Sequence, residues 1–296
     1  DENGGPLWSK AFDGQFSVLF TKSLFTDPQN NIFLFGRVNG TVDFGAGPEA
    51  SFGPADNLFV VKLDPLGAHL FSSSLGNVNS DQEVQSVTAD PSGNIVLGGV
   101  FTGNIDVGGG PLPSAGQGDL FVIKLDPGGS NVWSKALGDA SDQAGRALVA
   151  TDGNGAVLVA GHFQGTLDFG LGQLPSAGQS DLFAAKLDAD GNALWSKRYG
   201  DAADQTLRAV AYDGMGNVLA GGAFGGAINL GGAMFTMNAL RPAQRWWPLV
   251  GPGFSASWIT GDVYDKCREG VKTAEGKSMW EQRSWKPQGE TFKPCW

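Results

Sequence analysis

The stretch NLFVVKLDPLG at residues 57–67 recurs as DLFVIKLDPGG at 119–129 and as DLFAAKLDADG at 181–191, with a spacing of 62 residues both times. A second landmark has the same period, because the aromatic residues of LWSKAF, LFSSSLG, VWSKALG and LWSKRYG are spaced by 63, 62 and 62 residues. They are Trp8, Phe71, Trp133 and Trp195. A third landmark, GRVNGTVDFG, returns in related form three times. A fixed period of this kind indicates a repeat protein with four recognisable copies.

One copy, residues 119–180, divides into strands at its turn residues. The run DLFVIKLD is apolar and β-branched, a Pro-Gly-Gly turn follows at 127–129, and NVWSKAL is its partner strand. After the polar loop GDASDQAG, the run RALVATD meets a Gly-Asn-Gly turn at 153–155, and AVLVAGHF completes a second hairpin. A short TLDFG segment then precedes a loop rich in Gly, Pro and Ser. Each copy is therefore predicted to hold four strands, with a short fifth as an alternative.

Four antiparallel strands repeated around an axis form the blades of a β-propeller. The runs AVLVAG and NIVLGG are apolar at nearly every position, which is typical of strands buried on both faces, as they are between stacked blades. No helical periodicity occurs in the copies. The sequence thus predicts an all-β fold, a propeller of four-stranded antiparallel blades. It has four clear repeats of about 62 residues and, as an alternative, a degenerate fifth.

The turns of the repeat resemble those of a known family. DPSGNI from Asp90 and DGMGNV from Asp213 share the motif Asp-x-x-Gly-Asn-hydrophobic, followed by a short apolar strand that ends in glycine, with variants from Asp27 and Asp152. In this motif the chain resembles the secreted bacterial β-propeller repeat proteins over about residues 7–232, although its units are longer than is usual there. The resemblance implies a propeller and secretion. It implies no particular function, because the family is diverse in role.

The composition changes after the last copy, which predicts repeats over 1–240 and a Trp-rich tail over 241–296. The tail holds six of the nine tryptophans and nine basic against six acidic side chains, whereas the repeats hold 24 acidic against 11 basic ones. SASWITGDVYD around Trp258 echoes ALWSKRYGDAAD around Trp195, which favours a degenerate last blade. The alternatives are a capping segment and sequence foreign to the repeat. Because the chain begins at LWSKAF without a preceding DLFVxKLD strand, we expect the tail after Trp246 to supply that partner.

Charge and cysteine content restrict the partners and the compartment. The formal charge of −10 gives a surface that repels phosphate backbones, so nucleic acid is not an expected partner. No apolar run is long enough to predict a membrane span. A start at Asp1 rather than at Met predicts a processed or trimmed N-terminus. Two cysteines, Cys267 and Cys295, fit either a disulfide of an oxidising compartment or a pair of thiols, and the expected location is extracellular or periplasmic.

The chain is poor in catalytic groups. Its two histidines, His69 and His162, lie apart in sequence from any GxSxG-type motif or cysteine, and no paired Cys/His spacing supports zinc. No cofactor is therefore expected. Calcium is the alternative, since Asp188, Asp190 and Asn192 place oxygen ligands at alternate positions beside a glycine. Asp and Gly also favour hairpin turns for conformational reasons, and the equivalent turns lack the second carboxylate.

Polar residues recur in the loop between the two hairpins of each copy, and these are the ligand-binding candidates. They are Asp81, Gln82, Asp142, Gln143, Arg146, Asp204, Gln205 and Arg208. Asp, Gln and Arg side chains at one end of a propeller could bond sugar hydroxyls once per blade. The alternative is structural, with Asp capping the loop and Gln tying adjacent blades. The repeated tryptophans have the same two interpretations, as platforms for sugars or as packing between blades.

These observations predict a secreted, non-catalytic binding or scaffold propeller, adhesive or carbohydrate-binding, that gains avidity from repeated weak sites. Its expected partner is a glycan or an extracellular protein at a cell surface. The first alternative is a propeller-type enzyme that cleaves glycosides with paired carboxylates, because such chemistry needs only two of them. The second is a structural subunit of an extracellular assembly. The sequence leaves the oligomeric state open.

Overall fold

The computed structural model describes residues 5–50, 56–76, 81–141, 145–213, 215–231 and 234–236. Within these ranges the chain forms strands and turns and contains no helix, as the sequence predicts. Several predictions lie outside the described residues: the character of the tail over 241–296, the state of Cys267 and Cys295, and the roles of Asp142 and Gln143.

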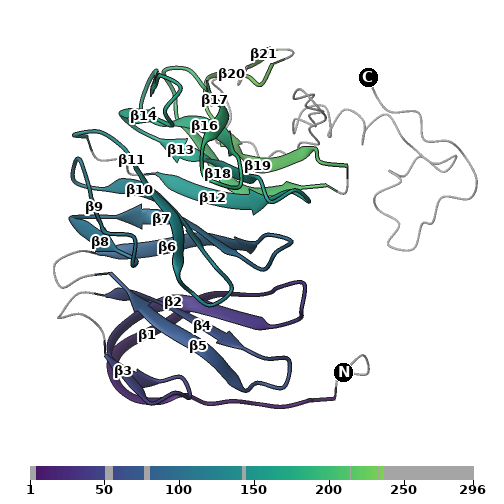
Figure 1. Cartoon of the computed structure of the whole chain (residues 1–296). Coiled ribbons are helices and arrows are strands. Elements are labelled where there is room, and N and C mark those ends of the chain that lie inside the picture. The colour runs from purple at the N-terminus through teal and green to yellow at the C-terminus, as the bar shows by residue number, and fades with distance from the viewer. Residues whose placement is uncertain are drawn as a thin grey trace, which may run out of the picture.

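The long strands assemble into four antiparallel sheets that follow one another along the chain (Figure 1). The first has the order β1 (Asp13–Thr26), β2 (Ile32–Asp43), β4 (Asn57–Leu63) and β5 (His69–Leu75). The second has the order β6 (Gln82–Ala89), β7 (Ile95–Phe101), β10 (Asp119–Leu125) and β11 (Asn131–Leu137). The third has the order β12 (Arg146–Thr151), β13 (Val157–Phe163), β16 (Asp181–Leu187) and β17 (Ala193–Tyr199). The fourth, within the described ranges, pairs β18 (Gln205–Tyr212) with β19 (Val218–Phe224).

A short hairpin follows the second strand of each sheet. These hairpins are β8 (Asn104–Asp106) with β9 (Pro111–Pro113), β14 (Thr166–Asp168) with β15 (Gln173–Pro175), and β20 (Ala227–Asn229) with β21 (Met234–Thr236). In the first sheet the end of β2 pairs with β3 (Pro48–Ala50) in the same place.

Seven hairpin turns share one construction, which explains the repeated Asp and Gly. The first residue of each turn is Asp27, Asp64, Asp90, Asp126, Asp152, Asp188 or Asp213. In every turn its carboxylate accepts N–H bonds from the residues two and four positions further on. The residue three positions on has a positive φ of between 62 and 89°, which favours glycine, and only Asn30 stands there in its place. The predicted turns are thus confirmed.

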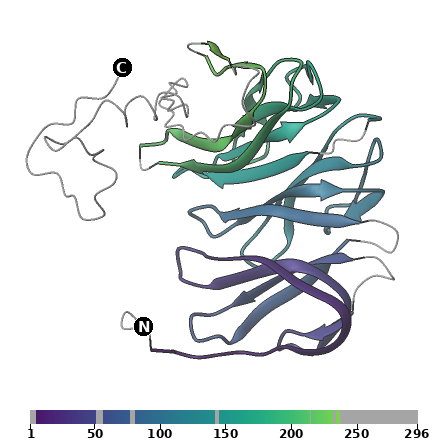
Figure 2. The same ribbon diagram turned by 180° about the vertical axis from the view of Figure 1, so that it is seen from behind.

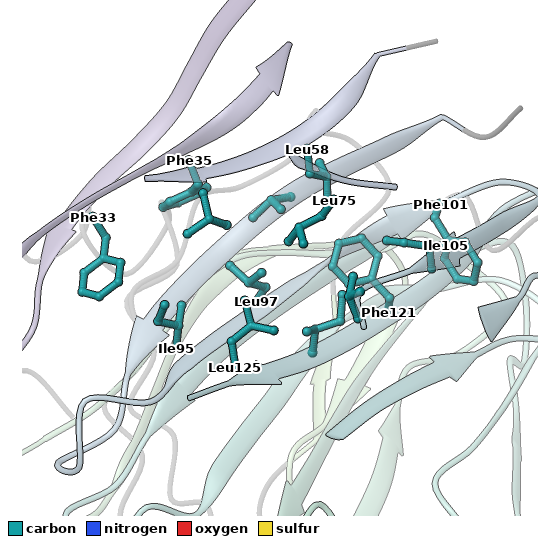
Figure 3. Close-up of a cluster of buried hydrophobic side chains, with 14 residues drawn as sticks. Phe33, Phe35, Leu58, Leu75, Ile95, Leu97, Phe101, Ile105, Phe121 and Leu125 are labelled. Carbon is teal, nitrogen blue, oxygen red and sulfur yellow. The ribbon is translucent and has the colours of Figure 1, made fainter. Parts of the chain in front are cut away.

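The sheets stack face to face in chain order, as the two opposite views show (Figure 1, Figure 2). Between the first and second sheets, Phe33 and Phe35 of β2 meet Ile95 and Leu97 of β7 and Phe121 of β10 in one buried cluster (Figure 3). A second cluster joins the opposite face of the second sheet to the third sheet. The central strands are therefore buried on both faces, which is why they read as continuous apolar runs.

Neighbouring sheets lie closest at their first strands. Between β6 and β12, the backbone N–H of Ala147 donates to Gln85 Oε1 at 2.9 Å, and that of Val149 donates to Ser86 Oγ at 3.1 Å. At the far side of the third sheet, the hairpin β14–β15 packs against β17 and adds Leu167 to the cluster between the second and third sheets. Direct bonds at one side and an inserted hairpin at the other mean that these sheets fan outward from their first strands.

A buried ion pair recurs within the sheets. In the second sheet, Lys124 of β10 reaches Asp90 in the β6–β7 turn at 2.9 Å, with both side chains 3% exposed. Its ammonium also donates to the carbonyl oxygen of Ala189 in the third sheet at 3.2 Å. Lys62 pairs with Asp27 at 3.3 Å in the same way. Burial opposes ionisation of Asp90, but bonds from Asn94 and Lys124 outweigh it and lower its pKa. One lysine thus connects two strands of a sheet with the neighbouring sheet.

The repeated aromatic residues pack on the outer turn of a sheet. The ring of Trp133 in β11 lies against Gly191 of the third sheet and donates from Nε1 to the carbonyl oxygen of Ala189 at 3.0 Å. Trp8 lies in the same way against Gly67, although residues 7–12 form no strand. The start of the chain was expected to be a strand that lacks its partner, and it is instead an extended segment along the first sheet.

The hairpins are those predicted, but their grouping into sheets differs from the prediction. The sequence groups 119–137 with the hairpin that follows it, whereas β10–β11 belongs to the second sheet and β12–β13 to the third. The reason is the pairing of β13. After β13 the chain forms the short hairpin β14–β15 and returns as β16, which pairs with β13 along its full length, from Val157 opposite Leu187 to Phe163 opposite Asp181. Each unit therefore begins half a repeat later than the sequence analysis places it.

Candidate functional site

The ligand candidates within the described residues gather at the starts of the first strands. Gln82, Arg146 and Gln205 are the first residues of β6, β12 and β18, and Asp81 and Asp204 immediately precede β6 and β18. Because β6 packs against β12 and β12 against β18, these three positions lie in a row along one end of the stack. Arg208 follows in β18. The fold thus brings residues that are about one repeat apart in sequence to the same rim.

Two of these candidates are enclosed in the protein. Gln205 is buried, and its side-chain Nε2 donates to Asp201 Oδ1 at 3.1 Å and to the carbonyl oxygen of Gly225 at 3.3 Å. Its backbone N–H donates to the carbonyl oxygen of Ser180 at 2.8 Å, which connects the fourth sheet to the third. Gln82 is buried beside Gly76. A ligand at the rim would meet their neighbours and not these amides.

The other four candidates are accessible, and we call them the rim row: Asp81, Arg146, Asp204 and Arg208. Asp81, Asp204 and Arg208 are exposed, and Arg146 is half-buried. The loops that carry the two aspartates are fixed by backbone bonds, from Thr102 N–H to the carbonyl oxygen of Asp81 at 2.9 Å and from Gly225 N–H to that of Asp204 at 2.7 Å. The rim row therefore presents two carboxylates and two guanidiniums from a rigid backbone, a set able to accept and donate hydrogen bonds to a polyhydroxylated ligand.

A histidine lies behind the rim row. His162 Nδ1 accepts a hydrogen bond from the backbone N–H of Leu207 at 3.3 Å and so joins β13 to β18. Burial, followed by the nearby guanidinium of Arg146, lowers the pKa of His162 to about 4. The imidazole is therefore neutral at physiological pH and acts as a hydrogen-bond acceptor in the contact between two sheets.

At the opposite ends of the strands, the calcium candidates form one of the hairpin turns. Asp188 Oδ1 accepts the backbone N–H groups of Asp190 at 3.0 Å and Asn192 at 2.8 Å, and Asp188 Oδ2 accepts the side-chain amide of Asn192 at 3.1 Å. Asp188 thus uses both oxygens within the turn. Nowhere in the part of the chain that the structure describes do three His, Cys, Asp or Glu side chains gather as a metal site requires.

One polar cluster was missed by the sequence analysis. On the outer face of the first sheet, His69 Nε2 lies 2.8 Å from Ser72 Oγ, and Ser72 Oγ donates to Glu49. A bulge between His69 and Phe71 in β5 brings the histidine to the side of Ser72. Burial and the neighbouring Asp43 carboxylate raise the pKa of Glu49.

This cluster is a departure from the repeat. Glu49 of β3 pairs with Val42 of β2, and the equivalent positions of the other short hairpins hold Leu112, Leu174 and Phe235. Comparing the copies position by position would have revealed a carboxylate where an apolar residue is the rule. The Glu49 carboxylate connects the β2–β3 hairpin to β5 through its hydrogen bond with Ser72, in place of apolar packing.

Comparison with known proteins adds two partial similarities. No protein-family model matches the chain. It is 30% identical over 164 residues to the regulatory protein FlaEY of Caulobacter vibrioides, which covers 53% of this chain and 17% of that protein. It is 27% identical over 160 residues to an uncharacterized WD repeat-containing protein of Acanthamoeba polyphaga mimivirus, which covers 47% of this chain and 11% of that protein.

The chain thus spans less than a fifth of either relative. In the described residues, no helix has the length and hydropathy of a membrane span. Repeated four-stranded antiparallel sheets, together with a WD-repeat relative, give an all-β protein with the character of a repeat protein.

Proposed function

We propose that the stacked sheets are blades of a β-propeller of the secreted bacterial repeat type. The fan-like arrangement of the second and third sheets supports this, because sheets that touch at their first strands and are held apart by a hairpin at the far side are rotated about an axis near those strands. Partial similarity to a WD repeat-containing protein is consistent with such a ring. The first strands would then line its centre.

The proposed function is non-catalytic binding or scaffolding in an extracellular or periplasmic compartment. The observation that carries it is the rim row, in which Asp81, Arg146, Asp204 and Arg208 recur at the starts of successive first strands. Alternating carboxylates and guanidiniums suit the hydroxyl groups of a glycan or the polar surface of an extracellular protein. Because each sheet offers only a few such groups, affinity would come from several engaged at once.

Retention on polysaccharide tests this proposal through a matched pair of charge changes. Arg208→Ala should weaken binding to the polysaccharide retained by the unchanged protein by about tenfold, the effect of losing one charged hydrogen bond. Lys197→Ala removes the same charge from an exposed position on β17, away from the first strands, and should leave binding unchanged.

A glycan array and a concentration-dependent pull-down provide the measurement. Equal losses in the two variants would indicate non-specific attraction to charge, and the rim row would then not be the site. If the unchanged protein is retained on no glycan, the carbohydrate-binding proposal is wrong, and a role as a structural subunit takes its place.

A further inference from the structure

In the part of the chain that the structure describes, the fourth sheet has fewer strands than the other three. Within the described residues it consists of β18 and β19, whereas the second strand of each other sheet pairs with a third strand. That third strand is β4, β10 or β16, which read NLFVVKL, DLFVIKL and DLFAAKL. All three pair with the second strand in one antiparallel register, with the final Leu opposite the first residue of that strand and the initial Asn or Asp opposite its seventh residue.

The lysine of the third strand forms an ion pair with an equivalent aspartate in each of the three sheets. Lys62, Lys124 and Lys186 each reach an aspartate of the turn between the first and second strands, at 3.3, 2.9 and 2.8 Å. The aspartate is held in place by its own turn, and in the second sheet Asn94 Nδ2 donates to Asp90 Oδ2 at 2.8 Å. The third strand is thus recognised by its backbone and by one charge.

Asp213 of the fourth sheet has this same construction without the lysine. Its Oδ1 accepts the backbone N–H groups of Met215 and Asn217, each at 2.8 Å, and its Oδ2 accepts Asn217 Nδ2 at 2.7 Å. Among the residues that the structure describes, no basic side chain contacts it. Within the described ranges, the Asp213 carboxylate therefore has the position and the hydrogen bonds of Asp90 but not its counter-charge.

Strand β19, which follows this turn, is also less buried than the equivalent strands β7 and β13. Five consecutive residues at the start of β7 and of β13 are buried, whereas those of β19 are only half-buried. A Cβ on Gly98 of β7 would meet the carbonyl oxygen of Ala147 in the next sheet, while one on the equivalent Gly221 would meet nothing within 4 Å. Both the partner strand and the covering sheet are absent from the described surroundings of β19.

We infer that the outer edge of β19 is a binding site for a β-strand of the pattern Asp/Asn-Leu-Phe-x-x-Lys-Leu, the third strand of a further repeat of this kind. The strand would pair antiparallel with residues 218–223 and place its lysine beside Asp213. Main-chain hydrogen bonds would provide affinity, and the buried lysine would provide selectivity. This inference rests on the sheets themselves and is independent of any ligand of the rim row.

A synthetic peptide with the sequence of residues 119–137, the third and fourth strands of the second sheet, tests the inference on the full chain. Addition of this peptide should slow hydrogen exchange of the amides in β19. A peptide with Met in place of its lysine should bind about tenfold more weakly, as expected for loss of one charged hydrogen bond. Asp213→Asn in the protein should weaken binding of the lysine peptide by a similar factor and leave binding of the Met peptide unchanged.

Asp188→Asn is the matched control, because it changes an equivalent turn aspartate in the third sheet. It should bind the peptide as the unchanged protein does. The inference is overturned if β19 shows no protection, if the lysine and Met peptides bind equally, or if Asp188→Asn weakens binding as much as Asp213→Asn. Loss of glycan retention in the rim-row variants would not affect this experiment, so the two proposals fail separately.

Discussion

Gly161→Val is expected to lower the free energy of unfolding by about 3 kcal/mol or more, the upper range for overpacking a buried site. A Cβ on Gly161 would overlap the carbonyl oxygen of Arg146 and would lie 2.9 Å from the ring of Phe183. The carbonyl belongs to the neighbouring strand β12 and cannot move without breaking the β12–β13 pairing. The close approach is therefore within one sheet, between paired backbones. Urea unfolding followed by tryptophan fluorescence measures the loss.

Gly153→Val is the control for this prediction. Gly153 lies in the exposed turn of the same hairpin, and a Cβ there would meet nothing within 4 Å. Its effect should stay near that of an ordinary surface substitution, within about 0.5 kcal/mol. Similar losses in the two variants would mean that strand β13 is not packed against β12 and β16 as described.

Lys124→Met is expected to destabilise the protein by about 3 to 5 kcal/mol, the cost of leaving one member of a buried ion pair without its partner. Methionine preserves most of the volume but removes the charge beside Asp90 and the bond to the carbonyl oxygen of Ala189. Adding Asp90→Asn should recover part of the loss, because the amide carries no buried charge. Chemical unfolding of the two single variants and the double variant measures the coupling.

Lys186→Met provides the matched comparison in the third sheet. The pair of Lys186 and Asp152 has a similar distance of 2.8 Å, but its side chains are 27% and 11% exposed. Water screens this pair more, so the substitution should cost clearly less than Lys124→Met. An equal or larger cost would show that burial does not set the strength of these pairs.

Turn chemistry is local, and for that reason the hairpins could be predicted from sequence. An Asp that accepts N–H bonds two and four positions on, with a Gly at positive φ between them, needs no tertiary partner. The grouping of hairpins into sheets depends instead on which strands of successive hairpins pair with each other, and both β10 and β13 are apolar runs that could pair on either side. The 62-residue period determines the length of a unit but not where it begins.

The candidate site was predictable to a similar extent. Repetition identified Gln82 and Gln205 together with their exposed neighbours. The burial of Gln205 depends on Asp201 and Gly225, which only the folded chain brings close to it. Glu49 was missed because a search for repeated residues does not detect a residue that differs from its equivalents in the other copies.

A disulfide between neighbouring first strands tests the central claim that the sheets stack with these strands side by side, the geometry on which the proposed propeller and its rim row depend. The hydroxyl oxygens of Thr88 in β6 and Thr151 in β12 lie 3.4 Å apart, so Thr88→Cys with Thr151→Cys should form a bond under mild oxidation. Peptide mapping distinguishes it from any bond made by Cys267 or Cys295. Thr88→Cys with Lys197→Cys, on the last strand of the third sheet, should form none. The account predicts the first bond in nearly all folded molecules, whereas its absence, or equal yields from the two pairs, would contradict the stacking of the repeats.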